Sequence, residues 1–164
     1  MEFTHSVTYP ASFEKVISTN FSEEFLVSLT GLSDVGVPEL TEFSEDEATL
    51  KAVTSWAYTG QLDPMARALL KNKDLTWVQT TTIDKASKLG TIDTVYMEGS
   101  IPGSCEAAIS YTDNGDGTTT RNLDGKIFVK IPVVGATVEK RLVDGINSRL
   151  EEEAQHLITF LAKS

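Results

Sequence analysis

The C-terminal run from Pro132 to Lys163 is the feature that most limits how this chain can fold. Apolar residues recur along it every three or four positions, which is the spacing of one face of an α-helix. They are Val134, Val138, Leu142, Ile146, Leu150, Ala154, Leu157, Ile158 and Leu161. A helix of roughly 30 residues is about 45 Å long. So long an apolar stripe has to be buried, and the rest of the chain must supply a surface that covers it.

Segments with the periodicity of β-strands make up most of that surface. Phe3 to Tyr9 has the period-2 pattern of a strand with one buried face, and Leu75 to Ile83 is rich in β-branched and aromatic residues. The predicted strands cover residues 3–9, 35–43, 48–58, 75–83, 91–101, 104–112 and 118–131. The second is the weakest, because Pro38 interrupts it. Short turns join most successive strands, which must then be antiparallel, since parallel neighbours need crossovers of a dozen or more residues.

Three short helices are predicted between the strands. Ser12 and Ser22 can each cap a helix, the first running from Phe13 to about Ser18, and Asp63-Pro64 can open a third. The predicted fold is α+β: a curved antiparallel sheet of about seven strands, two short helices after the first strand, and the long C-terminal helix packed against the sheet. No linker or repeat interrupts the chain, so residues 1–164 are expected to form a single domain.

Charge is distributed unevenly along the chain. The whole sequence holds 14 Lys and Arg against 24 Asp and Glu, a net charge of −10. Residues 1–50 account for most of this excess, because they contain ten acidic residues and one basic residue, Lys15. Nucleic-acid binding draws most of its affinity from clustered Lys and Arg, so this balance argues against a nucleic-acid partner.

Other features argue against a metal site, secretion and membrane insertion. Cys105 is the one cysteine, and His5 and His156 are the two histidines, which leaves little for a transition-metal site. Asp113 to Gly117 is predicted to be a hairpin turn and not a calcium loop, because an EF-hand register would place Leu123 where an acidic ligand is required. The start of the chain lacks the pattern of a signal peptide, and no apolar run approaches about 18 residues. A cytoplasmic protein without a membrane span or cofactor is expected.

The order of elements and several short strings resemble the START-like superfamily, also called SRPBCC or Bet v 1-like. The strings are Phe3-Thr4-His5 through Tyr9-Pro10-Ala11-Ser12, Leu75-Thr76-Trp77-Val78-Gln79-Thr80, Gly99 to Gly103, and Gly125 with Ile131-Pro132-Val133-Val134-Gly135 leading into Glu139. More closely, the chain is similar to a bacterial family of uncharacterised START-like domains. The resemblance implies a helix-grip fold, in which a seven-stranded sheet wraps around the C-terminal helix and encloses a cavity. Across the superfamily such cavities hold lipids, sterols, hormones and polyketides, and in some branches they support cyclisation.

Polar residues on the predicted inner faces of the strands agree with a cavity. His5, Thr54, Gln79, Thr81 and Arg121 fall there, and an unpaired buried polar group costs about 1–3 kcal/mol. Either these residues bond one another or they face a wet pocket with apolar walls. The candidate ligand-binding residues are His5, Val7, Trp56, Trp77, Gln79, Thr81, Met97, Ile109, Arg121, Val138, Leu142 and Ile146.

Three functions fit these patterns. The first is non-catalytic binding of a hydrophobic or amphipathic small molecule, lipid-like or polyketide-like, in the cavity between the sheet and the long helix. An acidic N-terminal third beside the cavity entrance would favour a neutral or cationic ligand. The second is a cyclase or hydratase that uses the same cavity, with His5, Glu98 or Glu106 as acid or base. The third is a protein-interaction domain whose acidic third binds a basic partner.

Overall fold

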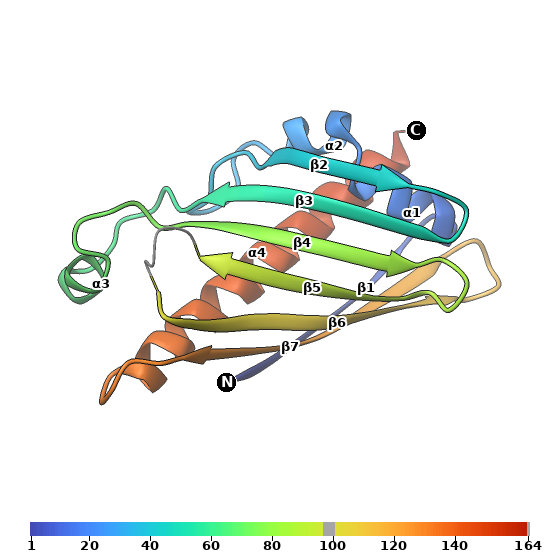
Figure 1. The fold of residues 1–164 in the computed structure, drawn as a ribbon. Coiled ribbons are helices and arrows are strands. Elements are labelled where there is room, and N and C mark those ends of the chain that lie inside the picture. Colours follow the sequence, from blue (N-terminus) through green and yellow to red (C-terminus); the bar gives the residue numbers. More distant parts are fainter. Residues whose placement is uncertain (97–100, 164) are drawn as a thin grey trace.

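Across residues 1–96 and 101–163, which the computed structural model describes, seven antiparallel strands form one curved sheet around a long helix (Figure 1). The strands are β1 (Glu2–Tyr9), β2 (Glu39–Glu45), β3 (Thr49–Ala57), β4 (Thr76–Asp84), β5 (Leu89–Tyr96), β6 (Gly103–Asp113) and β7 (Thr119–Val129). The helices are α1 (Phe13–Asn20), α2 (Glu23–Ser28), α3 (Pro64–Leu69) and α4 (Gly135–Ala162). This is the α+β helix-grip fold that the sequence predicted.

The order of strands across the sheet is β1-β7-β6-β5-β4-β3-β2. Strands β2 to β7 are each paired with their neighbours in the chain, as expected for strands joined by short turns. Strand β1 instead pairs with β7, in a register that runs from Glu2 opposite Lys126 to Tyr9 opposite Thr119. Strand β2 begins later than predicted, at Glu39, because Pro38 has no N–H to donate, and Val35 forms only an isolated bridge with Tyr58.

Side chains at the predicted cap positions begin the short helices. The hydroxyl of Ser12 accepts from the N–H of Lys15 in α1, and the hydroxyl of Ser22 accepts from the N–H of Phe25 in α2. The carboxylate of Asp63 accepts from the N–H of Ala66 in the same way, at 2.8 Å, and Pro64 occupies the first turn of α3. All three helix starts predicted from the sequence are confirmed.

Helix α4 does not cover the concave face of the sheet evenly. It packs mainly against β1 and β7, and its C-terminal part also packs against α1 (Figure 1). Phe3, Leu123 and Ile127 on these strands form one apolar cluster with Val138 and Leu150 of α4. The carboxylate of Glu139 accepts from the N–H of Val129 at 3.0 Å and so ties the start of α4 to the end of β7. No helix among the described residues is long and apolar enough to cross a membrane.

Two glycines, Gly125 in β7 and Gly145 in α4, lead to opposite predictions for a substitution by alanine. The ring of Phe3 lies against Gly125, its register partner on β7, so closely that a Cβ atom there would overlap it. We expect Gly125→Ala to lower the free energy of unfolding by about 1–3 kcal/mol, as overpacked core substitutions do. Gly145 lies in α4 with open space where a Cβ would be, so Gly145→Ala should raise it by about 0.5–1 kcal/mol. Urea denaturation measures both, and an undiminished stability of Gly125→Ala would contradict the packing of Phe3.

Candidate functional site

A cavity of about 530 Å³ lies between α4 and the middle of the sheet. Its volume is within the range of small-molecule sites, about 300–1,000 Å³. The strands β4 to β7 contribute Trp77, Gln79, Ile92, Thr94, Tyr96, Cys105, Glu106, Ala107 and Leu123. Helix α4 contributes Val138, Leu142, Ile146, Arg149 and Leu150, together with more exposed residues. Most of the wall is therefore apolar.

Helix α3 and the residues around it close part of the cavity. Leu62, Met65 and Leu69 line this side, and none of the three is fully exposed to solvent. The carboxylate of Asp63 forms an ion pair with Arg141 of α4, which ties α3 to α4. The segment after α2 completes the rim, and there the carboxylate of Glu152 accepts from the N–H of Ser33 at 2.7 Å. Hydrogen bonds from Ser33, first from its side chain and then from its backbone N–H, lower the pKa of Glu152.

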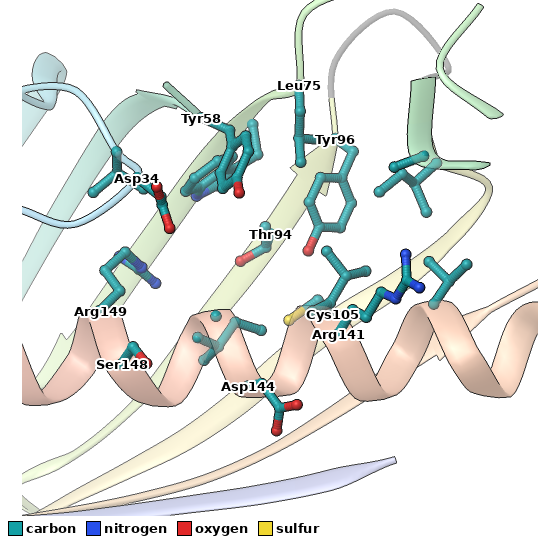
Figure 2. Close-up of a pocket in the computed structure, with 18 of the residues that line it drawn as sticks. Asp34, Tyr58, Leu75, Thr94, Tyr96, Cys105, Arg141, Asp144, Ser148 and Arg149 are labelled. Carbon is teal, nitrogen blue, oxygen red and sulfur yellow. The ribbon is translucent and has the colours of Figure 1, made fainter. Parts of the chain in front are cut away.

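Arg149 is the most buried cation in the cavity wall. Its side chain, 11% exposed, rises from α4 toward the strands (Figure 2). Its Nη1 donates to Oε1 of Glu153 at 2.6 Å, and its Nη2 donates to Oε1 of Gln79 at 3.4 Å. The guanidinium carbon lies 4.7 Å from the ring centroid of Trp56 and 5.9 Å from that of Trp77. Since these two rings are stacked in parallel, they present aromatic faces to the cation.

Two other polar groups on the strands that line the cavity, the phenol of Tyr96 and the thiol of Cys105, are protonated at neutral pH. Burial raises the pKa of the Tyr96 phenol well above its usual value. Burial also raises the pKa of the Cys105 thiol, although a hydrogen bond with Thr94 and the charge of Arg149 oppose the shift in part. Figure 2 shows Thr94, Tyr96 and Cys105 gathered in one part of the cavity, opposite α4. Cys105 is thus a protonated, weakly nucleophilic thiol.

Five of the predicted ligand-binding residues line this cavity: Trp77, Gln79, Val138, Leu142 and Ile146. The structure places six others outside its lining: His5, Val7, Trp56, Thr81, Ile109 and Arg121. Met97, like the candidate acid Glu98, lies outside the described residues. Trp56 is buried behind the wall, where its ring faces Arg149 and its Nε1 donates to Thr54.

His5 and Arg121 contact each other on a different part of the sheet, although Nε of Arg121 is buried without a hydrogen-bond partner among the described residues. Nη2 of Arg121 on β7 lies 3.5 Å from Nδ1 of His5 on β1, and Nε2 of His5 lies 3.1 Å from a carboxylate oxygen of Glu151 on α4. The physical reason is that α4 packs directly on β1 and β7, which leaves no room for a ligand there. For these residues, mutual bonding is the alternative that the structure supports.

The sequence did not point to Arg149, Thr94, Tyr96 or the residues of α3 as cavity residues. Arg149 precedes Leu150 of the apolar stripe, and an arginine in that position is usually a surface residue. The first third of the chain also contributes less charge to the cavity than expected, because of its ten acidic residues only Asp34 is among the described lining residues. Glu106 belongs to the lining but is exposed. No group of three or more potential metal ligands is found within the described ranges.

Comparisons with known proteins agree with this architecture. The family model described as "Protein of unknown function (DUF2505)" matches residues 4–161. No curated protein matches the chain significantly.

Similar solved structures share the fold at low sequence identity. TTHA0849 from Thermus thermophilus is 17% identical, with a TM-score of 0.64 over 97% of this chain and 98% of that chain. The Zhui aromatase/cyclase from Streptomyces sp. R1128 is 10% identical, with a TM-score of 0.63 over 97% and 92%. A START superfamily protein from Mycobacterium smegmatis is 17% identical, with a TM-score of 0.54 over 99% and 97%. The chain therefore has the START-like fold and belongs to the family described as "Protein of unknown function (DUF2505)".

Proposed function

We propose that this protein binds a hydrophobic or amphipathic small molecule, lipid-like or polyketide-like, between α4 and the middle of the sheet. The observation that carries the proposal is the cavity itself: about 530 Å³, walled mainly by apolar side chains, with a few polar groups gathered inside. Sites for small molecules in proteins have this composition, because apolar walls supply affinity and a few polar groups fix orientation. The START-like fold supports the proposal, since one structure that shares it is an aromatase/cyclase.

Binding without catalysis is the simpler use of this cavity. His5, one candidate acid or base, is held by Arg121 and Glu151 away from the cavity lining. Glu106 is exposed, and Cys105 is a thiol whose pKa is raised by burial. A free cysteine also suits the reducing cytoplasm, which we propose as the location. The acidic net charge of the chain favours a neutral or cationic ligand.

Filling the cavity tests the proposal directly. Ala107 and Ala108 are neighbours on β6; Ala107 lines the cavity, whereas Ala108 is exposed. We expect Ala107→Phe to weaken the binding of a neutral apolar dye such as Nile red at least about tenfold, because the new ring occupies ligand space. The control, Ala108→Phe, should bind the dye like the wild-type protein. Fluorescence titration measures both, and a wild-type protein that binds neither Nile red nor any molecule retained in native mass spectrometry would refute the proposal.

Cys105 offers an independent measurement without a substitution. Its buried, protonated thiol should react with iodoacetamide at least about tenfold more slowly at pH 8 than in the urea-unfolded chain. Because Cys105 lines the cavity, saturating Nile red should slow the folded-state reaction further. Mass spectrometry of the alkylated protein gives the rates. A rate that the dye leaves unchanged would place the dye elsewhere on the molecule.

A further inference from the structure

The guanidinium of Arg149 has more N–H donors than its hydrogen bonds to Glu153 and Gln79 use. A guanidinium has five N–H donors, and two of them are used in the hydrogen bonds to Glu153 and Gln79. The indole faces of Trp56 and Trp77 hold the group in place but accept no conventional hydrogen bond. Arg149 therefore brings donors to a largely apolar cavity, and its position is fixed before any ligand arrives.

Charge around Arg149 limits which acceptor can bind there. The carboxylate of Glu153, 2.6 Å away, already balances the cation, and Glu153 is itself only 17% exposed. Asp34 and Glu152, both acidic, also belong to the cavity lining. An anionic ligand group would bring a second negative charge to the Arg149–Glu153 pair, whose side chains are only 11% and 17% exposed, and this is costly. An uncharged oxygen accepts the same hydrogen bond without that cost.

Tyr96 and Arg141 differ in where they lie: Tyr96 points into the cavity, whereas Arg141 belongs to its rim. Tyr96 carries a protonated hydroxyl that points into the cavity and can donate a further hydrogen bond (Figure 2). The other lining arginine, Arg141, is 52% exposed and paired with Asp63, so it belongs to the rim. Arg149 and Tyr96 thus both bring hydrogen-bond donors to the cavity, which suits an acceptor group on the ligand.

Resting on the proposed function, we infer that Arg149 anchors the polar end of the ligand and that this end is an uncharged oxygen acceptor, such as a carbonyl, on an otherwise apolar body. Glu153 and Gln79 act as positioning residues, because each accepts a hydrogen bond that fixes the guanidinium.

Three probes with one naphthalene body separate the contributions: 2-acetylnaphthalene, 2-ethylnaphthalene and 2-naphthoate. In the wild-type protein we expect the ketone to bind more tightly than the carboxylate. In Arg149→Met the ratio of ketone affinity to hydrocarbon affinity should fall about tenfold, because one charge-assisted hydrogen bond is lost. The double variant Arg149→Met/Glu153→Gln, which does not leave a largely buried carboxylate unpaired, should show the same fall. The control Lys140→Met, which removes an exposed cation of α4 outside the cavity lining, should keep the wild-type ratio.

A measurement on the wild-type protein alone guards against variants that fail to fold. The infrared stretching frequency of the bound ketone carbonyl should lie below its value in hexane, as expected for a hydrogen-bonded carbonyl. An unshifted carbonyl, an unchanged affinity ratio in both Arg149 variants, or tighter binding of 2-naphthoate than of the ketone overturns the inference while leaving cavity binding intact. Absence of binding by all three probes overturns the proposed function as well.

Discussion

The packing of α4 along β1 and β7 determines the remaining architecture. A seven-stranded sheet is about 29 Å wide, since neighbouring strands are ~4.8 Å apart, whereas a helix with its side chains is about 10–12 Å across. One helix at one side of the sheet therefore leaves the middle strands uncovered. The short helices α1 and α2 cover the sheet near the C-terminal end of α4, and α3 lies beyond the ends of β3 and β4 (Figure 1). The space that none of them fills is the cavity.

Local patterns in the sequence predicted the helices and strands, because the start of a helix or the inner face of a strand depends on a few neighbouring residues. The hydroxyl of Ser22 and the carboxylate of Asp63 begin helices where the sequence indicated. Alternation likewise identified the inner face of β1, but it could not identify what lies opposite that face. Gln79 faces the cavity, whereas His5, equally inward, meets α4 and Glu151. That difference depends on where α4 crosses the sheet, and the sequence of a single strand does not contain this information.

Three consecutive glutamates on α4 illustrate the same limit. In the sequence Glu151, Glu152 and Glu153 have the appearance of a solvated charge run. Successive residues on a helix point in directions about 100° apart, and each of these carboxylates meets a different part of the fold. The first contacts His5 on β1, the second the backbone of Ser33, and the third Arg149 at the cavity. This short stretch of α4 thereby joins the first strand, the segment after α2 and the candidate site.

The pairing of β1 with β7 also has a consequence for the time at which the molecule can fold. Tyr9 lies opposite Thr119, and Glu2 lies opposite Lys126, so more than 100 residues must be synthesised before the first strand has a partner. At about 5–20 residues per second, the ribosome needs on the order of ten seconds to supply them. Hairpins from β2 to β6 can close during that interval, because their contacts are local. Strand β1 thus leaves the ribosome long before its partner β7, and the nascent chain must keep Phe3 and Tyr9 from aggregating until that partner and α4 are complete.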